Sequence, residues 1–82
     1  MSVEQKIREF ILENYLFTDD QSALDSSDSF LEKDIIDSTG IMEVIFFIEE
    51  QFEISVADEE MIPENLDSVN NLVKFIAAKQ AA

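Results

Sequence analysis

The sequence predicts an all-α fold, and three features lead to this prediction. The chain has 82 residues, of which 46% are hydrophobic, but it contains one glycine and one proline, too few for the many turns of a sheet protein. Apolar residues recur at helical spacing in three separate stretches. A chain of this length forms one domain with a single modest core. We therefore expect residues 1–82 to form one small four-helix bundle, with three long helices and a short third helix.

The first long helix is predicted from Ser2 to about Phe17. Ser2 followed by Gln5 fits a capping box, in which each side chain accepts a hydrogen bond from the other residue's backbone amide. Apolar residues then recur on one helical face. They are Val3, Ile7, Phe10 and Ile11.

An acidic, serine-rich segment, TDDQSALDSSDSFLEKD, follows and is predicted to be a long loop over residues 18–34. Leu24, Phe30 and Leu31 are its isolated apolar residues, and we expect all three to enter the core. The loop is longer than most connections, which indicates either a function or a short helical turn without a clear periodicity.

The second long helix is predicted from Ser38 to about Glu53. Asp37 is its expected N-cap, and Ile36 and Ile41 stand at the two positions of a hydrophobic staple. At about 100° per residue, five apolar residues gather on the face expected to point to the core. They are Ile41, Val44, Ile45, Ile48 and Phe52. Phe47 falls outside this face, and its packing is not predicted.

The remaining helices are predicted from candidate N-cap residues and from the position of the single proline. Asp58 is expected to cap one short turn that ends at Met61, and Ile62 is expected to be non-helical because Pro63 follows it. The last helix is predicted to start at residue 67 or 68. Its apolar residues at helical spacing are Val69, Leu72, Val73 and Ile76.

The charge balance excludes several classes of function. Nineteen acidic residues against five basic ones give a net charge of −14, so the surface repels nucleic acid and anionic membranes and attracts basic proteins. The chain starts without a secretory leader and has no apolar run near the ~18 residues of a membrane span. It also lacks cysteine, and with it disulfide and thiolate chemistry. We therefore expect a monomeric cytoplasmic protein with basic protein partners.

The exposed face of the second helix combines carboxylates with two large apolar residues. With Ser38 taken as the zero of angle, Met42 and Phe46 fall within an arc of about 120° on this face. The acidic residues in the same arc are Glu43, Glu49, Glu50 and Glu53. A solvated charged face is the simpler interpretation, since single exposed apolar residues are common. The alternative is a docking surface, on which carboxylates steer a basic partner and the two apolar side chains hold it.

Ser38 is better placed for modification than for catalysis. At the first helical position it lies at the positive end of the helix dipole, which favours an attached phosphate. As a nucleophile it would need a neighbouring base, and the chain has no histidine or cysteine. We therefore predict no catalytic residue. The alternative role for Ser38 is to share the capping function with Asp37.

A metal site is also not predicted. The segment DSSDSFLEKD is rich in oxygen ligands, but it lacks the glycine and the ligand spacing of an EF-hand. Weak divalent binding by the acidic surface would mainly relieve charge repulsion.

Two stretches resemble the acyl carrier protein family. DSTGIMEVIFFIEEQF is similar to the family's Asp-Ser-Leu signature and acidic recognition helix, and VADEEMIPENLDSV is similar to its short third helix and the start of its last helix. The resemblance implies that Ser38, preceded by Asp37, receives 4'-phosphopantetheine from coenzyme A through a phosphopantetheinyl transferase. It further implies that cargo is carried as a thioester and presented to activating and transferring enzymes with basic docking surfaces.

The resemblance also indicates which residues meet those enzymes. They are Thr39, Met42, Glu43, Phe46, Glu49, Glu50 and Glu53. Thr39 stands where leucine is usual in the family, which removes an apolar contact. The segments IIDSTG and PENLDSV resemble those of free-standing specialised carriers more than those of the housekeeping carrier of fatty acid biosynthesis. Acyl cargo in lipid metabolism is the first hypothesis. The alternatives are an aminoacyl or peptidyl carrier and an unmodified acidic adaptor.

Overall fold

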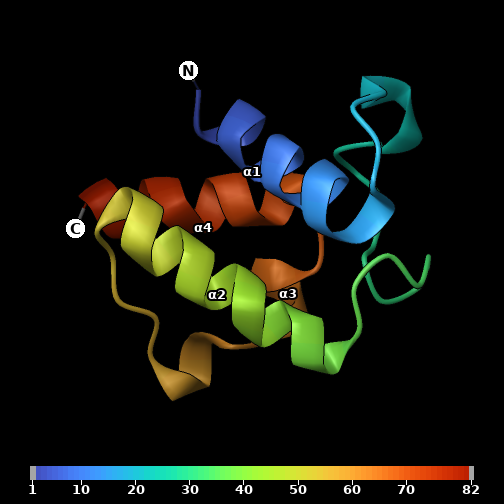
Figure 1. The fold of residues 1–82 in the computed structure, drawn as a ribbon. Helices are drawn as coiled ribbons and strands as arrows, with labels where there is room; N and C mark the ends of the chain where they lie inside the picture. Colours follow the sequence, from blue (N-terminus) through green and yellow to red (C-terminus); the bar gives the residue numbers. More distant parts are fainter. Residues whose placement is uncertain (1, 82) are drawn as a thin grey trace.

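The computed structural model describes residues 2–81, which are helical without any strand (Figure 1). The elements are α1 (Val3–Ile11), the π-helical turn η1 (Leu12–Leu16), the 3-10 turn η2 (Gln21–Ala23), α2 (Ser38–Phe52), the 3-10 turn η3 (Asp58–Glu60), α3 (Pro63–Leu66) and α4 (Val69–Ala81). The predicted bundle of three long helices and one short third helix is confirmed. None of the helices within residues 2–81 is long and apolar enough to cross a membrane.

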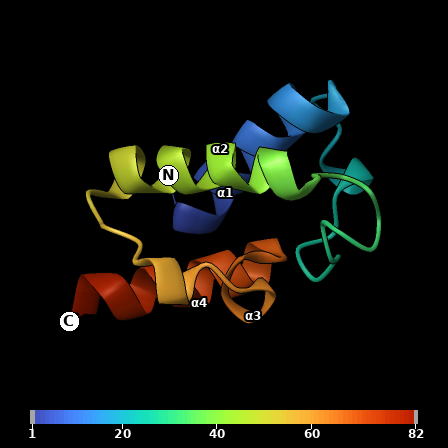
Figure 2. The ribbon, with the colours of Figure 1, turned by 90° about the horizontal axis from the view of Figure 1, so that it is seen from below.

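The helices pack with α2 on one side of the molecule and with α3 and α4 on the other (Figure 2). In Figure 1, α1 runs opposite to α2 and α4, and the long loop lies at one end. At the other end, Gln80 Nε2 donates to the carbonyl of Phe52 at 3.5 Å, which joins the last turns of α4 and α2.

The first helix follows its prediction with one difference at the cap. Ser2 Oγ accepts a hydrogen bond from the amide of Gln5 at 3.1 Å. The reciprocal half of the capping box is absent, because the Gln5 side chain donates instead to Glu9 at 3.2 Å. The helix continues through the π-helical turn to Leu16 and stops at Phe17, whose backbone is left-handed with φ 53°.

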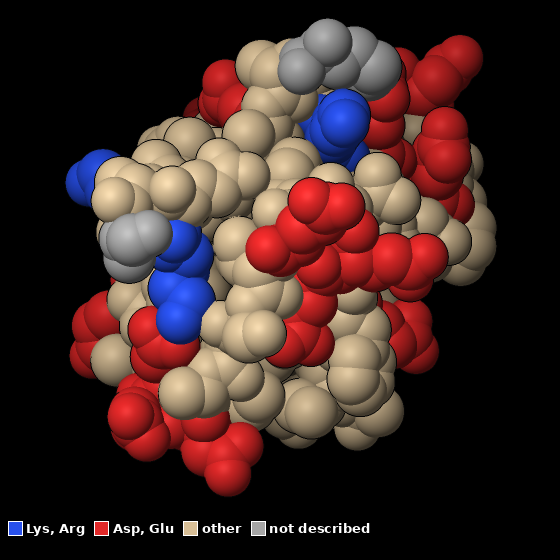
Figure 3. All heavy atoms as spheres, turned by 90° about the vertical axis from the view of Figure 1, so that its left-hand side faces the viewer, with Lys and Arg blue, Asp and Glu red and all other residues tan. Residues whose placement is uncertain are grey.

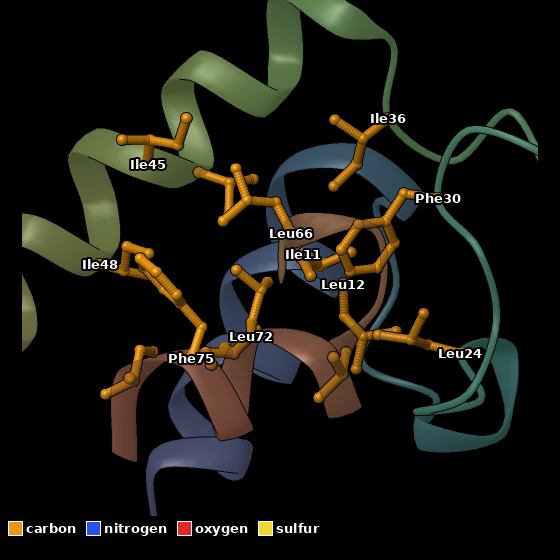
Figure 4. Packing of buried hydrophobic residues seen from close by; sticks show 14 residues of the cluster. Ile11, Leu12, Leu24, Phe30, Ile36, Ile45, Ile48, Leu66, Leu72 and Phe75 are labelled. Atoms are coloured by element: carbon orange, nitrogen blue, oxygen red, sulfur yellow. The ribbon is translucent and has the colours of Figure 1, made fainter. Parts of the chain in front are cut away.

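The core gathers side chains from all the long helices, from α3 and from the long loop (Figure 4). The buried apolar residues are Ile7, Ile11, Leu12, Leu24, Phe30, Ile36, Val44, Ile45, Ile48, Leu66, Val69, Leu72, Phe75 and Ile76. Ile41 and Phe52, predicted on the core face of α2, are only half-buried. Phe47 stacks on Phe10 of α1 with ring centroids 4.0 Å apart, so it joins the two helices beside the core.

The long loop enters the core at two of its three predicted positions. Leu24 and Phe30 are buried, but Leu31 is 41% exposed, so its predicted burial is wrong. The amide of Phe30 donates to the carbonyl of Asp67 at 2.8 Å, and the amide of Leu31 donates to the Asp67 carboxylate at 3.1 Å. These hydrogen bonds orient the Phe30 side chain toward the core, and the side chain of Leu31 then points away from it.

Arg8 of α1 binds the same loop through hydrogen bonds, a contact that the sequence analysis did not predict. Its guanidinium donates to the carbonyls of Gln21 and Leu24, both at 2.7 Å, and to Ser26 Oγ at 2.9 Å. Because these partners are loop residues without helical periodicity, the contact could not be predicted from patterns within one element.

The short third helix starts later than predicted. Residues 58–60 form a 3-10 turn whose N-cap is Ala57, so Asp58 is not the cap, and α3 starts at Pro63. Ile62 is extended as predicted, with φ −121° and ψ 153°. Proline suits a first helical position because its missing N–H would have no helical partner there. For α4, Ser68 is the cap, since its Oγ accepts from the amide of Asn71 at 3.1 Å.

Candidate modification site and docking surface

The first turn of α2 presents Ser38 at the surface. Asp37 is the N-cap, as predicted: its Oδ1 accepts from the amide of Gly40 at 2.7 Å, and its carbonyl accepts from the amide of Ile41 at 3.0 Å. Ser38 is exposed, and its hydroxyl makes no hydrogen bond to any residue in the described part of the chain. Asp37 therefore caps the helix alone, and the Ser38 hydroxyl is free.

A groove of about 210 Å³ lies beside Ser38, between α2 and the segment that contains α3. Its lining is apolar apart from Ser38 and Asp67. The lining residues are Leu31, Ser38, Ile41, Met42, Ile45, Met61, Ile62, Pro63, Leu66 and Asp67. Leu31, Met42 and Ile62 are large exposed apolar side chains. The free hydroxyl therefore borders an apolar surface that a hydrocarbon group can contact.

The acidic face of α2 is exposed around its two apolar residues. Met42 is 42% exposed and Phe46 63% exposed. Thr39, Glu43, Glu50 and Glu53 are exposed as well. Seen from the end at which α2 and α4 finish, carboxylates form several clusters among uncharged residues, and basic side chains show at a few places (Figure 3).

Glu49 differs from the other carboxylates of this face. It is half-buried, and its Oε2 accepts from the amide of Val56 at 2.9 Å. Because the Glu49 carboxylate binds the segment that follows α2, it is less available to a partner than the carboxylates of Glu50 and Glu53.

Tyr15 of η1 contacts the first two turns of α2. Its hydroxyl lies 2.8 Å from Glu43 Oε2 and 3.2 Å from the carbonyl of Gly40. Gly40 is buried, and a Cβ there would stand 2.6 Å from Ile36 Cγ2 and 3.2 Å from Tyr15 Cε1. Glycine weakens a helix by roughly 1 kcal/mol relative to alanine, but at this position it permits close packing.

The pKa of Tyr15 is raised to about 12 by partial burial, by the hydrogen bond to Glu43 and by the negative charges of Glu43 and Asp37. A raised folded-state pKa means that the phenol stabilises the fold fully below its ordinary pKa near 10 and loses this contribution as pH rises toward 12. We expect the free energy of unfolding to fall more steeply over this range in the native protein than in Tyr15→Phe.

Urea unfolding at pH 9 and at pH 11 measures this difference. All other titratable groups are the same in both proteins, so their contributions cancel in the comparison, and Tyr15 is the only tyrosine of the chain. An equal loss of stability in both proteins would contradict the expectation.

No family model matches the chain. An acyl carrier protein of Akkermansia muciniphila is 34% identical over 79 residues, which cover 96% of this chain and 94% of that protein. The solution NMR structure of a holo acyl carrier protein from Nitrosomonas europaea has a TM-score of 0.79 over the whole of both chains at 23% sequence identity. This second likeness shows the fold alone.

The chain is thus a small acidic helical bundle whose described residues include an exposed serine at the start of α2. The sequence identity and coverage of the curated relative then place this chain in the acyl carrier protein family. Membership implies a non-catalytic carrier with covalently attached 4'-phosphopantetheine.

Proposed function

We propose that Ser38 is the residue that carries 4'-phosphopantetheine, and that a phosphopantetheinyl transferase attaches it from coenzyme A. The observation that supports this proposal most directly is the free, exposed hydroxyl at the first position of α2. In the transfer, the Ser38 oxygen forms a bond to the phosphorus that carries the pantetheine arm, and the bond from that phosphorus to adenosine 3',5'-bisphosphate breaks. The hydroxyl proton goes to a base of the transferase, because the chain has no histidine.

The surroundings of Ser38 fit a phosphodiester. The amides of Ser38 and Thr39 have no acceptor among residues 2–81 and lie at the positive end of the helix dipole. The neighbouring carboxylate of Asp37 is already engaged with the amide of Gly40. Free amides and the helix dipole together favour the anion that the modification introduces.

The proposed cargo is an acyl group. When 4'-phosphopantetheine is attached, its terminal thiol would carry this acyl group as a thioester. The groove beside Ser38 supports an acyl cargo over an aminoacyl or peptidyl one, because apolar side chains dominate its lining. A role in fatty acid or lipid metabolism is part of this proposal. The cytoplasmic location and the monomeric state stay predictions.

The test is the intact mass of the protein after incubation with coenzyme A and a broad-specificity phosphopantetheinyl transferase. Gain of one phosphopantetheine is expected. A chain that several transferases leave unmodified would contradict the proposal and favour the unmodified acidic adaptor.

The proposed docking surface comprises Thr39, Met42, Glu43, Phe46, Glu50 and Glu53, with Glu49 at its edge. Its partners are the transferase and acyl-activating and acyl-transferring enzymes with basic surfaces. The exposed carboxylates attract such enzymes, and Met42 and Phe46 supply the apolar contact that loses its water on binding.

Replacing Phe46 with alanine is expected to raise the KM of the transferase for this carrier by roughly fivefold or more, since truncated anchor residues typically cost over 1 kcal/mol of binding. The steady-state rate of coenzyme A consumption at varied carrier concentration measures it. Phe17→Ala is the matched control, because Phe17 is 82% exposed and lies at the end of η1. Equal effects of the two substitutions would contradict the docking role.

A further inference from the structure

The turn that presents Ser38 is held from the opposite face of α2. At about 100° per residue, Gly40 lies roughly 200° around the helix from Ser38. On that side the Tyr15 hydroxyl is 3.2 Å from the Gly40 carbonyl and 2.8 Å from Glu43 Oε2, one turn further along. One phenol of η1 therefore contacts the first two turns of α2 and leaves the Ser38 side open.

The two acceptors share the single phenol proton of Tyr15, and packing reinforces these contacts. Because Gly40 has no Cβ, Ile36 and the Tyr15 ring approach the backbone of α2 closely. Tyr15 also meets Phe10 edge-on, with centroids 6.0 Å apart, and Phe10 stacks on Phe47 in the middle of α2. The contact between the N-terminal segment and α2 thus extends from Gly40 along the helix.

A helix start needs such support when it must present a reactive group. The first amides of a helix lack partners within the helix, so the first turn tends to fray. In this chain the Asp37 cap holds the turn within α2 itself, whereas Tyr15 connects it to a different element.

We propose that Tyr15 is a positioning residue for the modification of Ser38: its hydroxyl and ring clamp the first turn of α2 across Gly40 and so fix where the serine oxygen stands. This inference rests on the proposed function, because it needs Ser38 to be the attachment site. Transfer requires the serine oxygen in line with the phosphorus, and misplaced or mobile reacting atoms slow such a step strongly. Loss of the clamp is therefore expected to lower kcat, whereas loss of a docking contact is expected to raise KM.

Tyr15→Phe is the sharpest variant, because it keeps the ring that packs against Gly40 and removes only the hydroxyl. With a phosphopantetheinyl transferase and coenzyme A, we expect kcat for loading to fall about fivefold, the factor that corresponds to one net hydrogen bond, with KM nearly unchanged.

Two controls separate positioning from general stability. Ser2→Ala removes the cap of α1 and lowers stability by a similar amount, but it should leave kcat unchanged. Amide hydrogen exchange of Gly40 and Ile41, both bonded to Asp37, should rise about fivefold in Tyr15→Phe and stay unchanged in Ser2→Ala. Exchange of the buried Leu72 and Ile76 in α4 follows global stability and should rise similarly in the two variants.

An unchanged kcat in Tyr15→Phe, or an equal fall in Ser2→Ala, would overturn the inference. Failure of the proposed function gives a different result, because the native chain itself would then remain unmodified. The exchange rates of Gly40 and Ile41 depend on no transferase, and unchanged rates in Tyr15→Phe would show that the clamp itself is absent.

Discussion

Replacing Ser38 with alanine is expected to abolish gain of phosphopantetheine while leaving the fold intact. The substitution removes the only atom that we propose to form the bond to phosphorus. Stability should change little, because the Ser38 hydroxyl has no partner among the described residues and alanine favours helices. Intact mass after incubation with coenzyme A and a transferase measures loading, and circular dichroism measures the helix content.

Ser55→Ala is the matched control for this experiment, since Ser55 is also an exposed serine and lies outside the helices. It should gain one phosphopantetheine, as the native chain does. Modification of Ser38→Ala would show that another hydroxyl is the attachment site, with the neighbouring Thr39 as the first to test.

Replacing Phe30 with alanine is expected to destabilise the fold by about 3–5 kcal/mol, the usual effect of removing a fully buried aromatic ring. Phe30 is 0% exposed and anchors the long loop in the core through its ring and its amide. A single core of this size supplies only ~3–5 kcal/mol in total, so this one substitution is expected to unfold much of the population. Urea unfolding followed by circular dichroism measures the loss.

Phe17→Ala makes the same chemical change at an exposed position. Phe17 has a left-handed backbone, which alanine disfavours about as much as phenylalanine does. The control should therefore lose less than about 0.5 kcal/mol. Equal stability of the two variants would contradict the role of Phe30 as the anchor of the loop.

Local signals in the sequence were sufficient for the helix starts that the carrier needs. Asp37 before Ser38 predicted the cap of α2, and the cap is formed by a hydrogen bond over three residues. The same holds for Ser2 in α1 and for the extended backbone of Ile62 before Pro63. These features could be predicted because their partners lie within one turn of the chain.

The unpredicted features depend on partners far apart in the sequence. Leu31 points outward because Asp67, 36 residues later, binds its amide. Glu49 appeared to be a docking carboxylate on the helical wheel, but it binds the amide of Val56, which follows the end of α2. Helical periodicity describes one face of one element and contains no information on such contacts.

The sequence by itself determined the helical class, the strong negative charge and the position of Ser38 at the start of an acidic helix. Only the tertiary structure decided how this start is held, because Tyr15 reaches Gly40 and Glu43 across 25 and 28 residues. The physical reason is that caps and periodicity act over a few residues, whereas the space around Gly40 exists only once α1, η1 and α2 have packed together.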